Sequence, residues 1–236
     1  MSDRPVFKLD DRLMLCAEFV RSGAKIADIG TDHAYLPVWL AKQNKISHAV
    51  AADLRAEPLK SGDMNIKKYN AEDIVETRLS DGLTKISPDE ADDIIIAGMG
   101  GDLIASIIYN APWLKNAEKR LILQPMTKSE RLRKYLCDNG FEIKAEKAAI
   151  SDKKVYSVML CSYCGQKILY DELYLYLGKT VDDPSAQADE YINGKIIMLE
   201  RIRDGLLKAN NAEDAAEYDM MIQQINDIIS KRKTQK

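Results

Sequence analysis

Residues that bind metals or form disulfides are scarce in this sequence. Its 236 residues include four cysteines and two histidines, and Cys161 and Cys164 form a single CxxC pair. One such pair supplies half of a zinc site, and no second Cys or His pair lies near it. The sequence therefore predicts neither a disulfide framework nor a bound metal, and it favours two free thiols near a strand end.

Long apolar runs are also missing. No window approaches the roughly 20 apolar residues that a membrane-spanning helix needs, and residues 1–10 lack the apolar core of a secretory signal. The cytoplasm is therefore the expected compartment. With 46% hydrophobic and 30% charged residues, the composition is that of a globular protein. The length suits one α/β domain with a small additional module.

A strong excess of positive charge is absent as well. The net charge is −3 and the pI about 5.6, which argues against a surface that contacts nucleic acid throughout. The distribution is uneven, because residues 115–154 include eleven basic and six acidic side chains, whereas residues 165–230 include six basic and thirteen acidic ones. This asymmetry indicates either two surfaces with different partners or simply solvated helix faces.

Short apolar runs alternate with helical patterns over the first two thirds of the chain. This alternation predicts a parallel sheet with helices on both faces. Uniformly apolar runs, such as residues 94–96 and 121–123, are typical of central strands buried on both sides. The expected strands are residues 25–29, 48–53, 75–79, 92–97, 120–124, 141–149 and 155–161, and the expected helices between the first five are residues 35–42, 56–69, 103–109 and 129–139.

The two ends of the chain add helices to this pattern. Apolar residues at helical spacing from Leu9 to Val20 predict a helix before the first strand. The last two strands follow each other directly, so a hairpin should add an antiparallel strand. Apolar residues recur at helical spacing over 192–206 and 218–229, on either side of a polar turn, and predict an antiparallel helical hairpin. We place the domain boundary between residues 164 and 165, with an α/β domain at 1–164 and a coiled-coil-like module at 165–236.

The first expected strand ends in an acidic residue, a glycine turn and a helix start. Asp28, Gly30, Thr31, Asp32 and His33 form this corner. The glycine lets a ligand approach the backbone, and such sites lie at the carboxyl ends of parallel strands. The sequence is not a dinucleotide fingerprint, because Asp32 stands where a glycine is needed and would repel a pyrophosphate. As alternatives, Asp32 or Thr31 caps the helix, and His33 packs or caps.

Two further strand ends also carry carboxylates. Asp53 and Leu54 end the second strand, where an acid can accept both hydroxyls of a ribose. Asp81 and Gly82 follow the third, where an acid can bind an adenine amino group. Carboxylates at three successive strand ends suit S-adenosylmethionine (AdoMet), which carries no phosphate and has a cationic ammonium and sulfonium. They disfavour a nicotinamide dinucleotide.

The fourth and fifth strand ends contain a different set. Gly98, Met99, Gly100 and Gly101 follow the fourth strand, with more glycine than a turn requires. They predict a wall of backbone with a ligand packed against it, and Gln124 at the next strand end can donate to and accept from a base edge.

Several of these motifs resemble one family. Residues 28–37 (Asp-Ile-Gly-Thr-Asp-His-Ala-Tyr-Leu-Pro), 96–101 (Ile-Ala-Gly-Met-Gly-Gly) and 121–125 (Leu-Ile-Leu-Gln-Pro), together with Arg12-Leu13, are similar to the bacterial tRNA (adenine-22-N1)-methyltransferases. The resemblance covers about the first 160 residues. It implies a Rossmann-like class I methyltransferase sheet with a helical C-terminal part. Two residues depart from the family pattern, with Met126 in place of the usual Asn and Ser157 in place of the usual Glu.

The resemblance implies that AdoMet methylates N1 of a tRNA adenine. N1 has an in-plane lone pair and no proton to remove, so no general base is needed, and positioning should dominate catalysis. The base must first be exposed, because N1 lies on its Watson–Crick edge. We expect Gly98, Met99, Gly100, Gly101 and Gln124 to hold the adenine, Asp28, Gly30, Thr31, Asp32, His33, Asp53, Leu54, Asp81, Gly82, Gly98 and Met99 to hold AdoMet, and Arg12, Lys128, Arg131, Arg133 and Lys134 to contact tRNA phosphates.

Three alternatives stay open from the sequence. A methyltransferase of small molecules or proteins suits the acidic pI, and a non-enzymatic module that binds a partner through the helical hairpin is a second possibility. A nicotinamide-dependent dehydrogenase is the third and is disfavoured by Asp32. The oligomeric state is not fixed by the sequence, and a monomer is slightly favoured.

Overall fold

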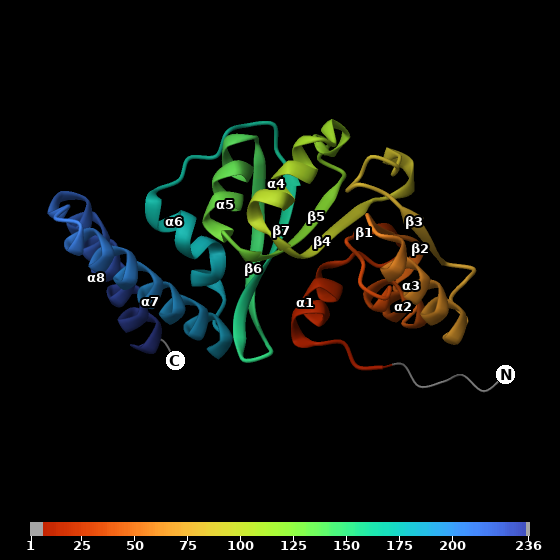
Figure 1. Ribbon diagram of the computed structural model, residues 1–236, viewed down its shortest axis with the longest axis horizontal. Helices are drawn as coiled ribbons and strands as arrows, with labels where there is room; N and C mark the ends of the chain where they lie inside the picture. The colour runs from red at the N-terminus through yellow and green to blue at the C-terminus, as the bar shows by residue number, and fades with distance from the viewer. Residues whose placement is uncertain (1–6, 235–236) are drawn as a thin grey trace.

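The computed structural model describes residues 7–234, which form a seven-stranded sheet and eight α-helices (Figure 1). Three short 3-10 turns, Pro88–Glu90, Pro112–Leu114 and Gly178–Asp182, connect some of these elements. The elements run in the order α1 (Asp11–Phe19), β1 (Ala24–Ile29), α2 (Tyr35–Lys42), β2 (Ile46–Asp53), α3 (Ala56–Lys68), β3 (Val75–Leu79), β4 (Asp93–Gly100), α4 (Gly101–Tyr109), β5 (Arg120–Thr127), α5 (Ser129–Asp138), β6 (Phe141–Ser151), β7 (Lys154–Tyr163), α6 (Glu172–Leu177), α7 (Ala186–Lys208) and α8 (Ala212–Thr234).

The strand order in the sheet is β3-β2-β1-β4-β5-β7-β6. The first five strands are parallel, and β7 pairs antiparallel with both β5 and β6. The α/β class and the terminal hairpin are therefore confirmed. The strand order reverses direction between β1 and β4, and ligands of open α/β sheets bind at the carboxyl ends of the strands beside such a switch point.

Alternate residues of the central strands enter two separate cores, because side chains of a strand point to opposite faces. Ile26, Ile95 and Ile122 pack with α1, α2 and α3 on one face. Ile94 and Ile96 pack with α4 and α5 on the other. All five side chains are fully buried, which confirms the central strands expected from uniformly apolar runs.

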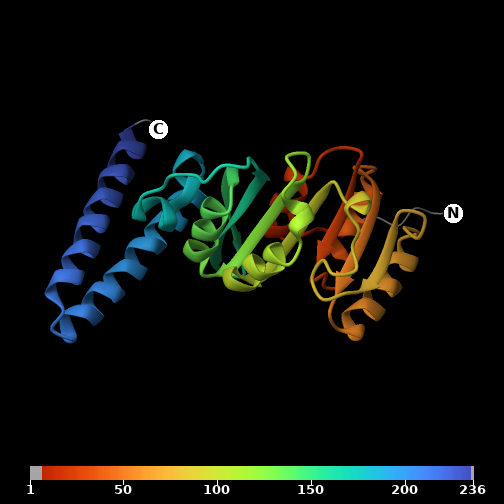
Figure 2. The ribbon, with the colours of Figure 1, turned by 90° about the horizontal axis from the view of Figure 1, so that it is seen from above.

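The helical hairpin α7–α8 projects from the β6 end of the sheet (Figure 2). Its first helix docks on the β6–β7 hairpin through Ala188 and Tyr191, which pack with Ala148 and Val155. Further along, Ile192 and Leu199 of α7 pack with residues of α8, as the apolar spacing predicted. The helical hairpin is therefore anchored to the sheet through the first half of α7.

Helix α6 was not expected from the sequence. Its residues, Glu-Leu-Tyr-Leu-Tyr-Leu, alternate with the period of a strand rather than that of a helix. The Asp171 side chain caps the helix by accepting a hydrogen bond from the Tyr174 amide at 2.7 Å. Burial of Leu175 and Leu177 then favours the helix over the alternating pattern. Among residues 7–234, no helix is long and apolar enough to cross a membrane.

Candidate active site

The carboxyl ends of β1, β2 and β3 are held together by backbone hydrogen bonds. The amides of Gly30 and Thr31 both donate to the Ala52 carbonyl, at 2.8 and 3.0 Å, and the Ser80 amide donates to the Asp53 carbonyl at 2.9 Å. These bonds fix the turns that follow β1 and β3 against the end of β2. The acidic residues expected to bind the cofactor therefore lie along one edge of the sheet.

Asp28 lies on β1 and is almost completely buried. Burial disfavours its charged form and raises the pKa of the carboxyl group to about 6. The nearby Thr31 hydroxyl and, to a smaller extent, Arg12 offset part of this effect, although Thr31 Oγ1 makes no hydrogen bond of normal geometry with residues 7–234. A buried carboxylate that forms no ion pair within residues 7–234 suits a site that receives positive charge from a ligand.

Asp53 and Asp81 occupy different environments at neighbouring strand ends. Asp53 ends β2 and is buried, and its Oδ1 accepts a hydrogen bond from the Arg55 amide at 2.8 Å. This bond orients the carboxylate. Asp81 lies in the exposed turn after β3, next to half-buried Gly82, and Leu54 is also exposed. The exposure of the three carboxylates thus increases along this edge from Asp28 to Asp53 to Asp81.

The glycine turn after β1 packs closely against the Met99 side chain. Gly30 has φ +74°, and a Cβ there would lie 2.1 Å from the Met99 methyl group. Ala34 is the N-cap residue of α2, with no capping side chain. The alternative that Asp32 or Thr31 caps this helix is therefore wrong. The Asp32 side chain is exposed and lies 3.2 Å from His33 Nε2.

This edge fits AdoMet. It offers buried carboxylates at the first two strand ends, an exposed one at the third, and a glycine turn with positive φ at Gly30. These groups match a cationic, phosphate-free nucleoside. Neither an additional cation nor a phosphate-binding loop is needed to explain why these groups lie at this edge.

Gln124 does not face a ligand. Its side chain is completely buried, and its Oε1 accepts hydrogen bonds from Arg12 Nη1 at 2.8 Å and from the Gly98 amide at 3.0 Å. Its Nε2 donates to the Pro125 carbonyl. The expectation that Gln124 reads a base edge is corrected here, because the amide is already used to hold Gly98. Arg12 is also mostly buried, at 16% side-chain exposure, and supports this site instead of projecting toward phosphates.

The glycines at 98–101 divide between two roles. Gly98 has φ +80° and is exposed, and strand β4 continues through it with irregular pairing to β5. Gly100 is partly exposed, and a Cβ there would lie 3.3 Å from Thr127 Oγ1. Gly101 is buried, and a Cβ there would lie 2.3 Å from the Lys128 carbonyl. Gly101 therefore serves close packing of α4, whereas Gly98 and Gly100 leave open backbone at the edge.

Arg133 is not a phosphate contact. It has no exposed side-chain area and forms an ion pair with equally buried Glu146, with Nη2 and Oε1 2.6 Å apart. Its Nη1 donates to the Leu175 and Tyr176 carbonyls, and its Nη2 also donates to the Tyr191 hydroxyl. The guanidinium thus joins α5, β6, α6 and α7. The expectation that Arg133 contacts RNA is therefore wrong.

Of the basic residues expected to contact RNA, Lys128, Arg131 and Lys134 are exposed. Lys128 and Arg131 both pair with Asp102, and their side chains are 50% and 64% exposed. Lys134 is 56% exposed and pairs with Asp138. Surface pairs of this kind are weak, so a phosphate can compete for the cations.

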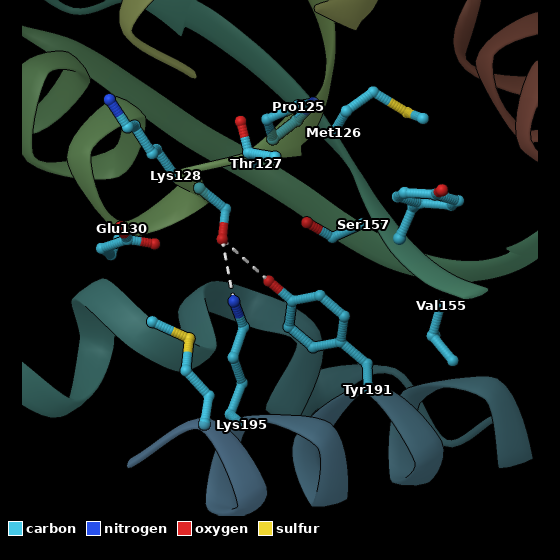
Figure 3. Close-up of a pocket in the computed structure, with 12 residues that line it drawn as sticks. Pro125, Met126, Thr127, Lys128, Glu130, Val155, Ser157, Tyr191 and Lys195 are labelled. Atoms are coloured by element: carbon cyan, nitrogen blue, oxygen red, sulfur yellow. Dashed lines mark hydrogen bonds between the residues drawn. The ribbon is translucent and has the colours of Figure 1, made fainter. Parts of the chain in front are cut away.

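A pocket of about 350 Å³ lies between the end of β5, strand β7 and helix α7 (Figure 3). Tyr191 and Lys195 of α7 line it together with Met126 and Ser157, the two departures from the family pattern. Sequence reasoning missed Tyr191 and Lys195 as site residues. The sequence predicts that both residues lie on a helix of the tail. It does not predict that this helix packs against residues of the sheet.

Comparison with known proteins agrees with this geometry. The chain matches the methyltransferase domain family over residues 9–159. It is 36% identical to the tRNA (adenine(22)-N(1))-methyltransferase of Bacillus subtilis over 174 residues, which are 74% of this chain and 73% of the relative.

Solved structures show the same fold over nearly the whole chain. The structure of the Bacillus subtilis m1A22 tRNA methyltransferase TrmK has a TM-score of 0.81 at 29% identity and covers 94% of this chain and 99% of that one. Mycoplasma capricolum TrmK in complex with S-adenosyl-homocysteine has a TM-score of 0.76 at 26% identity and covers 95% and 99%. The chain therefore belongs to the AdoMet-dependent tRNA (adenine-22-N1)-methyltransferase family.

Proposed function

We propose that this protein transfers a methyl group from AdoMet to N1 of adenine 22 in tRNA. The observation that carries the proposal is the 36% identity to an enzyme of that name over three quarters of the chain, combined with carboxylates at three successive strand ends. The family relationship favours tRNA over a small-molecule or protein substrate and over a non-enzymatic role. A tRNA substrate also supports the cytoplasm as the compartment. We further propose that the protein is a monomer and that the boundary between its two domains lies near residue 165.

The residues at the sheet edge are suited to hold the cofactor. AdoMet, when bound, supplies a methyl group on an electrophilic sulfonium. In this proposal Asp53 accepts the ribose hydroxyls, and Asp81 in the next turn binds the adenine amino group. Asp28 and the Gly30 turn lie on the side of β1, where the methionine part of the cofactor and its positive charge would be held.

Transfer to N1 needs positioning more than proton chemistry. Adenine N1 presents a lone pair, and the methylated base is cationic, so open carbonyl groups can stabilise the developing charge. Gly98 and Gly100 offer such carbonyl groups at the switch point of the sheet. There the Gln124 side chain accepts a hydrogen bond from the Gly98 amide. Gln124 is therefore a positioning residue that acts through this backbone. Lys128, Arg131 and Lys134 remain the proposed phosphate contacts.

The Asp53 assignment can be tested by binding. Replacing Asp53 with alanine should weaken AdoMet binding at least about 10-fold, because hydrogen bonds to a charged group contribute roughly 1.5–3 kcal/mol each. Calorimetry measures this directly. Asp73→Ala is a matched control, since Asp73 is exposed and lies before β3. Equal AdoMet affinity in the Asp53 variant and the wild type would reject this position for the ribose.

The raised pKa of Asp28 gives a pH-dependent prediction. Because the carboxyl pKa is about 6 in the folded protein and near 3.8 in the unfolded chain, the folded protein binds more protons between these values, and stability falls as pH rises through this window. Asp28→Asn should therefore raise the free energy of unfolding at pH 8 by on the order of 1–3 kcal/mol. At pH 3.5 most of the gain should be lost. Denaturant unfolding without AdoMet at both pH values measures this, and equal effects at the two would contradict it.

The proposed reaction is tested with purified protein, AdoMet and unmodified tRNA. A methyl group on N1 blocks Watson–Crick pairing, so reverse transcription should stop at position 22 after incubation. A tRNA in which adenine 22 is replaced by guanine provides the control. A methylated tRNA with no stop at that position would overturn the assignment to N1 of adenine 22.

A further inference from the structure

The pocket between β5, β7 and α7 is built from both parts of the chain. Its lining includes Thr127 and Ser129 at the junction of β5 and α5, Ser157 of β7, and Tyr191 and Lys195 of α7. Thr127 pairs with Gly100 across the sheet, so the pocket begins beside the open glycine backbone of the proposed active site. Any group bound here would lie next to the reacting base.

Hydrogen-bond donors converge on this pocket. Lys195 Nζ donates to Ser129 Oγ at 3.1 Å, and Ser129 Oγ lies 3.2 Å from the Tyr191 hydroxyl. The Ser157 hydroxyl points into the same space (Figure 3). Ser157 is only 1% exposed, and its hydroxyl has no hydrogen-bond partner within residues 7–234. A buried hydroxyl without a partner is costly, which indicates that a ligand completes its bonding.

Two lysines, Lys128 and Lys195, line the pocket. Lys195 lies over the Tyr191 ring, 4.9 Å from its centroid, and has no ion-pair partner within the described part of the chain. Burial raises the pKa of the Tyr191 hydroxyl, but Arg133 and Lys195 more than offset this and leave it below the ordinary value. Glu130 is the one acidic residue among those that line the pocket.

Helix α5 adds to the positive potential. Its ten residues begin beside the pocket at Ser129, and its N-cap residue, Lys128, has φ 56° and supplies no capping side chain. The amide groups at a helix N-terminus carry partial positive charge and bind anions. Together with the unpartnered Ser157 hydroxyl and Lys195, this helix end supplies the donors of an anion site.

We propose that this pocket binds a phosphate group, and that in the working enzyme this is a backbone phosphate of the tRNA beside the target adenine. The inference rests on the proposed function. It gives the acidic tail a specific role, because α7 contributes Lys195 and Tyr191 and so holds the nucleotide while the sheet edge holds the cofactor. A phosphate fits better than a base, because the polar groups are mainly donors and Lys195 covers one face of the Tyr191 ring.

Two variants and one control test the site. Ser157→Ala removes only the unpartnered hydroxyl, and Lys195→Met removes the cation while keeping a side chain of similar length. Lys208→Met is the control, because Lys208 is an exposed lysine at the end of the same helix. The measurements are titration with inorganic phosphate followed by the amide NMR shifts of residues 129–131, tRNA affinity at several salt concentrations, and steady-state methylation. AdoMet affinity and thermal stability show that each variant is folded.

The wild type and Lys208→Met should bind inorganic phosphate, and the other two variants should bind it at least about 10-fold more weakly. Lys195→Met should raise KM for tRNA about 10-fold and reduce the salt slope of binding by about one. Ser157→Ala should not lower the thermal stability, because its hydroxyl makes no hydrogen bond within residues 7–234 that could be lost.

Equal phosphate binding by all four proteins would overturn the proposal, as would a Ser157→Ala protein that loses stability but keeps its phosphate affinity. Phosphate binding that depends on both residues, with tRNA affinity and KM unchanged, would assign the site to a free phosphate and overturn its role in tRNA binding. The phosphate titration needs no tRNA. It therefore decides this site even if the wild type methylates no tRNA, which would count against the proposed function instead.

Discussion

Replacing Glu146 with glutamine is expected to lower the free energy of unfolding by about 3–5 kcal/mol, because it leaves the buried guanidinium of Arg133 without a counter-charge. Both side chains are fully buried, and they are joined by contacts of 2.6 and 3.2 Å. Burial by itself lowers the pKa of Arg133, but Glu146 and Tyr191 raise it above its ordinary value. The charge is therefore retained in the protein interior and needs its partner.

Chemical denaturation measures this loss, and Glu142→Gln is the control. Glu142 lies on the same strand, and its carboxylate pairs with Lys144 near the surface. Its replacement should change stability by less than about 1 kcal/mol. Because Arg133 also binds carbonyls of α6 and the Tyr191 hydroxyl of α7, the Glu146 variant should expose the tail to proteases before the sheet unfolds. Equal stability of the two glutamine variants would contradict the role of the ion pair.

Replacing Gly101 with alanine is expected to cost about 3 kcal/mol or more, at the upper end of the usual cost of overpacking. A Cβ there would lie 2.3 Å from the Lys128 carbonyl oxygen and 3.0 Å from the carbonyl carbon. These atoms belong to the backbone and cannot rotate away. Gly101 is also the first residue of α4, where alanine is a favourable helix residue, so the close contact alone decides the outcome.

Gly100→Ala is the matched comparison for Gly101→Ala. Gly100 has φ −71° and ψ 146°, which suit alanine, and its Cβ would meet only the Thr127 hydroxyl at 3.3 Å. We expect its stability to change by less than about 1 kcal/mol. If the target adenine lies against this backbone, single-turnover methylation should fall on the order of 100-fold while AdoMet affinity is kept. Unchanged methylation would mean that the base is held elsewhere.

Local sequence pattern was enough to predict the sheet and to bring the proposed cofactor-binding carboxylates to one of its edges. The apolar runs at residues 94–96 and 121–123 have no alternation, so burial on both faces follows from local pattern alone. The carboxylates at 28, 53 and 81 follow consecutive strands, and the carboxyl ends of parallel strands must meet at one edge. Helices α1, α7 and α8 also follow from the sequence, because their apolar residues recur at helical spacing.

The roles of individual polar side chains were decided only by tertiary structure. Arg133 lies in a basic segment, and the sequence predicts a surface residue there. In the structure it is buried, because it pairs with Glu146 and donates hydrogen bonds to carbonyls of α6. The sequence predicts that Gln124 binds a ligand. In the structure its side-chain oxygen accepts hydrogen bonds from Arg12 and the Gly98 amide. The pocket proposed to bind phosphate joins residues from β5, β7 and α7, which lie far apart in the sequence. Burial and hydrogen bonding depend on which distant segments pack together, and local pattern does not contain that information.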